Sequence, residues 1–135
     1  QGTFQKNRWH GTLQGPNLRA TQGIGYATLA GAGGTVTQAS SKSTGVTLNT
    51  ANGLITMNNA ALGADAIVSF TLTNDKIHDT DFIFLQHDSV ATVGAYVFCA
   101  QPAEGSAVIT VTNISTGSLS NAIVIRFMRF AGASS

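Results

Sequence analysis

The chain has 135 residues, of which only 10% are charged, and its formal net charge is +1. This length fits one domain with its own core, and seven scattered Lys and Arg residues do not make the basic face of a nucleic-acid-binding protein. No stretch reaches the roughly 18 to 20 apolar residues of a membrane-spanning helix, so neither nucleic acid nor membrane insertion is expected.

The first 34 residues are interrupted by Gly or Pro every few positions, which disfavours both long helices and long strands. We expect a Gly-rich N-terminal connector with one or two short strands, pinned to a surface by Trp9 and Tyr26. Its stretch "GIGYATLAGAGG" does not match a dinucleotide-binding fingerprint, so no cofactor is expected. The chain begins with Gln1 and shows no signal peptide, and we expect it to be a piece or processed product of a longer protein.

From residue 35 onward, short apolar runs rich in β-branched residues alternate with polar turns, and no long helical periodicity occurs. Strands are predicted at 35–38, 45–49, 54–58, 66–73, 81–87, 94–101, 106–112 and 122–130. The pattern predicts that residues 35–135 fold as an all-β, jelly-roll-like β-sandwich of about eight antiparallel strands. An immunoglobulin-like sandwich is the alternative.

Three local features carry further predictions. Asn52-Gly53, between the second and third predicted strands, favours a tight hairpin turn. Asn113-Ile114-Ser115 has the pattern of a glycosylation site, but its place in a short turn favours a turn-forming role for Asn113. Cys99 is the single cysteine, so no intrachain disulfide can form, and its apolar neighbours predict a buried side chain.

The last predicted strand, "AIVIRFMRF", is apolar on both faces. Alternation places Ile123, Ile125 and Phe127 on one face, which we assign to the core. A small sandwich has one core, so we interpret the second face as a subunit interface, although isolated surface hydrophobes are also common. An Arg on that face needs a carboxylate or carbonyl partner. The interface candidates are Val124, Arg126, Met128 and Phe130.

Acidic and histidine side chains are concentrated between residues 75 and 88. They are the types of side chain that bind metals, but their spacing matches no metal signature, and hydrated turn residues are the favoured interpretation. No metal is therefore expected. Asp79 with Asp81 or Glu104 is a carboxylate pair of the kind that glycosidases use. A glycosidase needs a deep cleft with aromatic platforms, for which a chain of 135 residues with 7% aromatic residues is poorly equipped, so no catalytic residue is assigned.

Three segments resemble a domain found at the C-terminal ends of bacteriophage tail-fibre, tail-spike and similar virion appendage proteins. They are "GAGGTVTQASSKSTGVTLNTANGLITMNNAAL", "AIVSFTLTN" and "VITVTNISTGSLSNAIVIRF", and together the resemblance covers about residues 31–130. It implies a small all-β tip or knob, usually homotrimeric, at the end of a longer fibrous protein. Its implied work is host-surface attachment or trimer stabilisation.

The expected function is therefore that of a non-catalytic trimeric tip on a virion, which binds a bacterial surface glycan or outer-membrane component. Its other expected partner is the rest of the appendage, N-terminal to this segment. A structural trimerisation or capsid-decorating domain is the alternative, and a small glycan hydrolase is the third. The receptor-contact candidates are Asp75, His78, Asp79, Asp81, His87 and Asp88.

Overall fold

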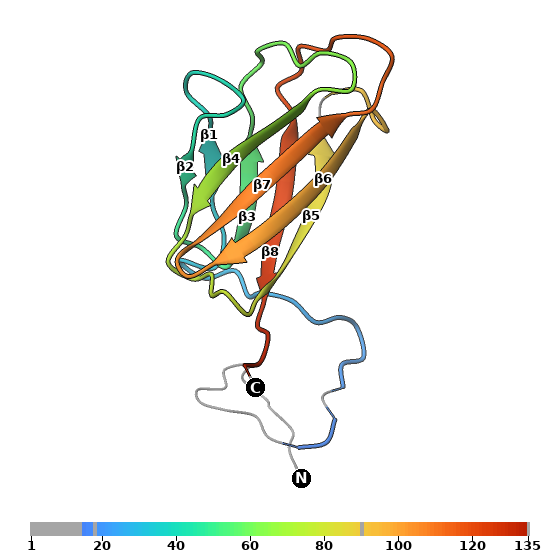
Figure 1. Cartoon of the computed structure of the whole chain (residues 1–135). Helices are drawn as coiled ribbons and strands as arrows, with labels where there is room; N and C mark the ends of the chain where they lie inside the picture. The colour runs from blue at the N-terminus through green and yellow to red at the C-terminus, as the bar shows by residue number, and fades with distance from the viewer. Residues whose placement is uncertain (1–14, 18, 90, 135) are drawn as a thin grey trace.

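The computed structural model describes residues 15–17, 19–89 and 91–134, and its described residues form two four-stranded sheets packed face to face as a β-sandwich (Figure 1). Sheet A has the strand order β1-β3-β8-β5, and sheet B has the order β2-β4-β7-β6. The strands are β1 Thr35–Thr37, β2 Val46–Thr47, β3 Asn52–Thr56, β4 Ile67–Thr73, β5 Phe82–Ser89, β6 Tyr96–Ala103, β7 Ser106–Asn113 and β8 Val124–Phe130.

The predicted sandwich and each of its eight predicted strands are confirmed, but the expectation of purely antiparallel pairing is not. β1 runs parallel to β3, and β2 runs parallel to β4. Both parallel pairs arise because the chain changes sheet after β1, after β2 and again after β3, so that β1 and β3 share sheet A while β2 and β4 share sheet B. The four remaining pairings are antiparallel.

The same crossing overturns the predicted hairpin at Asn52-Gly53. These residues begin β3, and β3 belongs to a different sheet from β2, so no hairpin joins the two strands. Gly53 is needed for another reason. A Cβ atom at Gly53 would lie 2.6 Å from the carbonyl oxygen of Gly34, so only glycine allows the two backbones to approach this closely.

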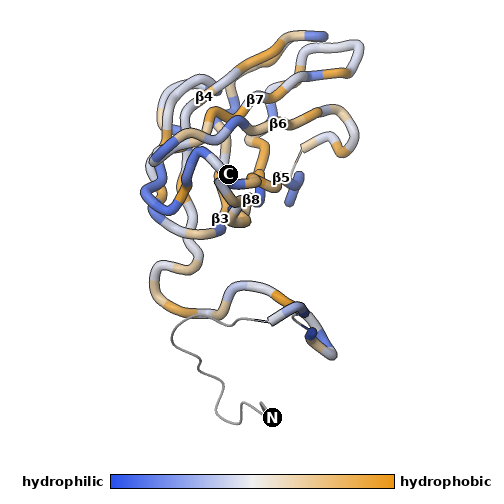
Figure 2. The backbone as a smooth tube through the Cα atoms, turned by 60° about the horizontal axis from the view of Figure 1, so that its bottom comes forward, coloured by the Kyte–Doolittle hydropathy of each residue, from blue (hydrophilic) through white to orange (hydrophobic). Residues whose placement is uncertain are grey.

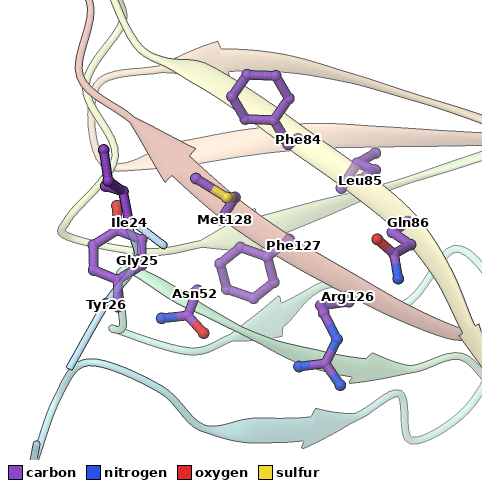
Figure 3. A pocket seen from close by; sticks show the side chains of 10 residues that line it. All are labelled: Ile24, Gly25, Tyr26, Asn52, Phe84, Leu85, Gln86, Arg126, Phe127 and Met128. Carbon is purple, nitrogen blue, oxygen red and sulfur yellow. The ribbon is translucent and has the colours of Figure 1, made fainter. Parts of the chain in front are cut away.

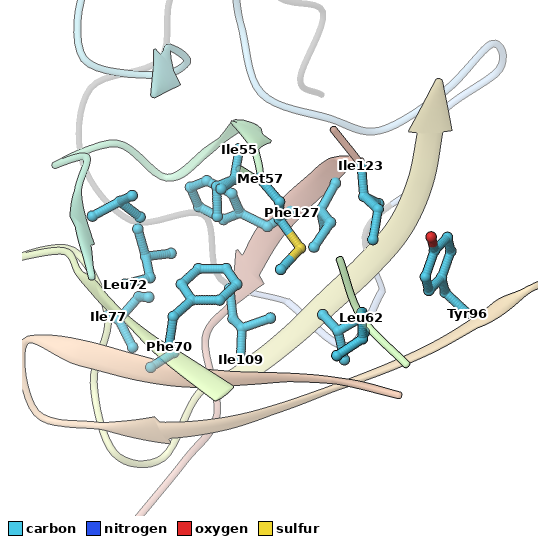
Figure 4. Close-up of a cluster of buried hydrophobic side chains, with 14 of the residues drawn as sticks. Ile55, Met57, Leu62, Phe70, Leu72, Ile77, Tyr96, Ile109, Ile123 and Phe127 are labelled. Carbon is cyan, nitrogen blue, oxygen red and sulfur yellow. The ribbon is translucent and has the colours of Figure 1, made fainter. Parts of the chain in front are cut away.

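The hydrophobic core lies between the two sheets. It draws on alternate residues of the long strands and on loop residues, and its large side chains interdigitate in Figure 4. On β8 the predicted core face is confirmed, because Ile123, Ile125 and Phe127 are at most 1% exposed. The period-2 pattern of sequence therefore fixes which face of the last strand enters the core.

The prediction for Cys99 is wrong, because this side chain is exposed. Cys99 lies opposite Thr110 on the outer face of sheet B, at a position where the alternation of β6 turns the side chain away from the core. Its apolar sequence neighbours Phe98 and Ala100 point inward and pack against the core instead. An apolar run is therefore no proof of burial for every member when the run is a strand.

The sandwich has two distinct ends (Figure 1). At the first, which we call the base, the chain enters β1 and leaves β8, and loops 48–51, 74–81 and 104–105 join strands. At the opposite end, which we call the crown, the described parts of the loops are 38–45, 57–66, 91–95 and 114–123. The two ends differ in chemistry, as shown below.

The described part of the predicted connector, which begins at residue 15, contains no strand and loops out below the base before it reaches β1 (Figure 1). Tyr26 attaches it to the sandwich, because its hydroxyl donates a hydrogen bond to the backbone carbonyl of Arg129. The anchoring role predicted for Tyr26 is thereby confirmed, while Trp9 lies outside the described residues. The described part of the chain contains no helix long and apolar enough to span a membrane.

Candidate interaction site

The outer face of sheet A carries a patch of exposed aromatic side chains near the base, which we call the aromatic face. The register of β5 and β8 places Phe82 opposite Phe130 and Phe84 opposite Met128. The three phenylalanines are 53% to 61% exposed, whereas the inward-facing Ile83, Leu85 and Phe127 pack into the core between the sheets. Figure 2 shows the hydrophobic colour along β5 beside β8. Contiguous exposed aromatic surface of this kind makes the aromatic face a candidate interaction site.

Arg126 forms the polar border of the aromatic face. It lies on β8 next to Gln86 of β5, one pair of residues closer to the crown than Met128. Its Nη2 and Nε atoms are each 2.8 Å from Oδ1 of Asp88. The predicted carboxylate partner of Arg126 is thereby confirmed. Because each charge has its opposite beside it, this part of the face is electrically balanced.

A groove of about 440 Å³ lies between the aromatic face and the connector. Ile24 and Tyr26 of the connector form one side, and Phe84 and Met128 form part of the other (Figure 3). The lining is mainly apolar, with amide groups from Asn52 and Gln86 at its margins. The groove therefore connects the aromatic face on β5 and β8 with the connector residues Ile24 and Tyr26.

The outer face of sheet B is different, because hydroxyl groups are interspersed among its exposed apolar residues. Ser69 and Thr110 lie opposite each other, and their hydroxyl oxygens are 2.7 Å apart. Ile67 and Val97 are exposed, but both lie opposite Thr112 rather than against each other. Isolated surface hydrophobes need no partner. The contrast favours sheet A as the interacting face.

The six residues predicted to contact a receptor do not form one cluster. Three of them, Asp75, His78 and Asp79, are exposed in loop 74–81 at the base. The imidazole Nδ1 of His78 lies 2.9 Å from Oε1 of Glu104 in the neighbouring loop. These residues form an exposed, charged surface at the end where the chain enters and leaves the sandwich.

Asp81 has a structural role instead, because it is buried and paired with Arg129. Its two carboxylate oxygens accept hydrogen bonds of 2.8 Å from Nε and Nη2 of Arg129. The backbone N–H of His78 donates a third bond of 2.9 Å. Burial by itself raises the pKa of Asp81, but the hydrogen bonds and charge of Arg129, with backbone N–H groups, outweigh burial and lower the pKa below 3.8.

This environment argues against the hydrolase alternative. A general acid needs a carboxyl group that keeps its proton near neutral pH, and a lowered pKa does the opposite. Asp81 is also buried while Asp79 is exposed, so these two carboxyl groups do not line a common surface. Glu104 is engaged with His78 rather than with Asp79 in the described contacts.

The last two candidates, His87 and Asp88, point to opposite sides of β5. The ring of His87 faces the space between the sheets, with ring centroids 6.1 Å from Tyr96 and 5.8 Å from Phe98. Asp88 is on the outer face of sheet A, where it pairs with Arg126. Among the described residues, no three His, Cys, Asp or Glu side chains are grouped closely enough to hold a metal ion.

Sequence reasoning overlooked three buried polar residues that organise the crown. Gln38, Lys42 and Asn113 are at most 3% exposed, and each hydrogen-bonds to a backbone group of another loop. No local signal separates these residues from the many exposed polar residues around them. Asn113 was assigned a turn-forming role, which is confirmed, because its side-chain oxygen accepts a bond from the N–H of Ser115.

Comparison of the chain with protein-family models, with curated proteins and with solved structures found no match in any of the three.

Proposed function

We propose that this chain is a non-catalytic domain of a bacteriophage virion appendage, which assembles as a homotrimer and attaches the virion to the host cell surface. The aromatic face of sheet A is the observation that carries the proposal. It leaves three phenylalanine side chains more than half exposed beside one another, outside a core that is already complete. The sequence resemblance to tail-fibre and tail-spike C-terminal domains supplies the class of protein and the expected number of subunits.

Two features favour further copies of the same chain as the occupants of the aromatic face. Phe82 begins β5 and Phe130 ends β8, so the face lies at the base, where the chain enters and leaves the sandwich. In the proposed appendage, the segments that precede the sandwich in neighbouring chains would therefore come together beside this face. The Arg126–Asp88 pair also balances the charge bordering the face, so copies can approach without burying an unpaired charge.

Sedimentation velocity of the purified chain tests the assembly. We expect a trimer, and we expect Phe84→Glu on the aromatic face to dissociate it, because three buried carboxylates would meet apolar surface. Val97→Glu is the matched control, since Val97 is 50% exposed and Phe84 is 53% exposed, but Val97 lies on sheet B. A monomeric wild-type chain, or equal effects of the two variants, would overturn the assembly.

Binding of the fluorescently labelled trimer to a panel of bacterial strains tests the attachment. Three copies held together make weak single contacts effective, so we expect retention on susceptible cells by the trimer and little by the Phe84→Glu variant. A well-assembled trimer that binds no strain susceptible to the parent virus would refute attachment. That outcome would instead favour the structural alternative, in which the domain only holds the appendage chains together.

A further inference from the structure

The crown is the end of the sandwich opposite to the one where the chain enters β1 and leaves β8. The chain enters β1 and leaves β8 at the base, so each crown loop only connects one strand to the next (Figure 1). These loops are nevertheless long, and the described parts of three of them span 38–45, 57–66 and 114–123. Loop 38–45 is only as long as loop 74–81 at the base, but 57–66 and 114–123 are longer, and connections longer than a few residues often carry function.

Buried polar side chains hold three of these loops in fixed positions relative to one another. Gln38 donates hydrogen bonds of 2.9 Å to the carbonyls of Lys42 and Thr44, and its own oxygen accepts one of 2.9 Å from the N–H of Asn58. The ammonium group of Lys42 donates to the carbonyls of Asn58 and Asn121. Loops 38–45, 57–66 and 114–123 are therefore linked at a single point.

A second set of bonds braces the other side of the crown. The side-chain amide of Asn113 donates to the carbonyls of Leu62, Gly63 and Gly117, at 2.9 to 3.0 Å. The hydroxyl of Tyr96 donates a 2.6 Å bond to Oδ1 of Asn121. Within the described part of the chain, every buried side-chain nitrogen and oxygen has a partner. The crown loops are thus held in one arrangement before any ligand arrives.

This arrangement is energetically demanding, which is why we connect it with a function. Burial lowers the pKa of Lys42, so the fold works against the charged form of this side chain. Two non-glycine residues in the crown, Asp65 and Ala91, have positive φ angles of 58° and 110°. The rest of the described chain has no other such residue. Strained backbone that surrounding contacts hold in place is concentrated at functional sites in proteins.

The exposed chemistry of the crown is neutral. Of the described residues in these loops, Asp65 is the one exposed charged side chain, and most other exposed side chains carry hydroxyl or amide groups. Val93 and Ile114 are 89% and 53% exposed, and their loops meet where the N–H of Ile114 donates to the carbonyl of Ala95. The described crown loops contain no aromatic residue, whereas protein-binding surfaces are enriched in aromatic residues and Arg.

From these observations we infer that the crown, rather than loop 74–81 at the base, is the surface that contacts the host, and that it binds a neutral polysaccharide. Hydroxyl and amide groups pair with sugar hydroxyls, while the aliphatic side chains of Val93 and Ile114 cover the apolar C–H faces of sugar rings. Fixed loops lose little conformational freedom on binding, which favours a ligand of weak individual contacts. The inference rests on the proposed attachment function.

Matched Thr→Arg variants distinguish the two ends of the sandwich. Thr116 in the crown and Thr80 at the base are both exposed loop residues. We expect Thr116→Arg in the full chain to weaken binding to purified neutral surface polysaccharide from susceptible cells by about tenfold or more, with Thr80→Arg unchanged. Val93→Arg is a second crown variant with the same expected loss. Sedimentation and thermal melting, unchanged in all three variants, exclude misassembly as the cause.

The possible outcomes separate this inference from the proposed function. Wild-type binding that Thr80→Arg or Asp79→Ala removes and both crown variants keep would overturn the crown as the contact surface and leave attachment intact. Binding to cells that protease treatment abolishes and polysaccharide removal does not would overturn the neutral polysaccharide as partner. Failure of the wild-type trimer to bind any susceptible strain would refute attachment itself, and the crown inference with it.

Discussion

The base and the crown of the sandwich differ in how their loops use polar residues. At the base, charged side chains such as Asp75, Lys76 and Asp79 are exposed, and loop 104–105 between β6 and β7 is short. At the crown, polar side chains such as Lys42 and Asn113 turn inward and bond to backbone carbonyls. Polar residues in loops therefore serve hydration at one end and internal order at the other.

One charged residue at the base, Asp81, is buried rather than exposed, and it allows the two ends to be compared by experiment. Asp81 and Arg129 form an ion pair whose carboxylate is nearly inaccessible to solvent, with the Asp81 side chain 1% exposed and that of Arg129 21% exposed. This pair joins the start of β5 to the end of β8, directly below the aromatic face. One charged pair thus holds segments together at the base, whereas a network of neutral and charged groups holds the loops together at the crown.

The largest effect on stability is expected from removing the central amide of the crown. Asn113→Ala removes a fully buried amide together with its three hydrogen bonds to the carbonyls of Leu62, Gly63 and Gly117, and we expect it to lower the free energy of unfolding by about 3 kcal/mol. Urea denaturation measures this change. Asn59→Ala is the matched control, because Asn59 is exposed in a neighbouring loop. Similar losses for both variants would show that the crown is not braced as described.

A smaller loss is expected from Asp81→Asn at the base. The substitution preserves shape but removes the charge that Arg129 faces, and partial exposure of Arg129 lets water compensate in part, so we expect about 2 kcal/mol. Urea denaturation again measures the change. Arg129→Met in combination with Asp81→Asn should cost less than the sum of the two single changes, because they share one interaction. Additive losses would mean that the pair contributes nothing as a pair.

The carboxylate of Asp81 also predicts how the stability of the fold changes at acid pH. The folded-state pKa of Asp81 is lowered, so its contribution to stability is fully present above the ordinary value of 3.8 and is lost as the pH falls through the lowered folded-state pKa. Thermal melts between about pH 5 and pH 2 should show a fall in stability that is shallower in Asp81→Asn. Identical pH profiles for the two proteins would contradict the lowered pKa.

The smallest effect is expected at the exposed His78–Glu104 pair. Both side chains are more than half exposed, and a pair of this kind contributes less than about 1 kcal/mol to stability. We expect His78→Ala to change the free energy of unfolding by no more than about 0.5 kcal/mol. A loss as large as that of Asp81→Asn would show that the charged loops of the base are organised as tightly as the crown.

Residue patterns predicted the parts of this fold that depend on alternation. The eight strands and the two-sided character of β8 follow from the period-2 pattern. Arg126 was expected to need a carboxylate or carbonyl partner, and it pairs with Asp88 although its side chain is half exposed. Lys42 escaped notice because its acceptor Asn121 is 79 positions away in the sequence. Contacts of this range depend on which loops the topology brings together, and the crossing between sheets after β1 leaves no local signal.

The burial of Asp81 also could not be predicted from its local sequence. Its neighbours Asp75, Asp79 and Asp88 have the same side chain and similar polar surroundings in sequence, yet Asp81 alone of the four is buried. Its burial depends on Arg129, 48 positions later, and on the place of both residues at the same end of paired strands. The six predicted receptor-contact residues between 75 and 88 are close in sequence, but the fold places them in several different environments.

The outermost strands of both sheets are each unsuited to lateral growth. β1 has three residues and β2 has two, so they offer few unpaired backbone groups on their open sides. On the other side, β5 is interrupted by a bulge between His87 and Ser89, and β6 contains Pro102, which has no N–H to donate. Longer and regular edge strands would expose backbone groups that can pair with another chain. In the proposed trimer, copies of this domain would therefore meet through side chains on their flat surfaces rather than through shared sheets.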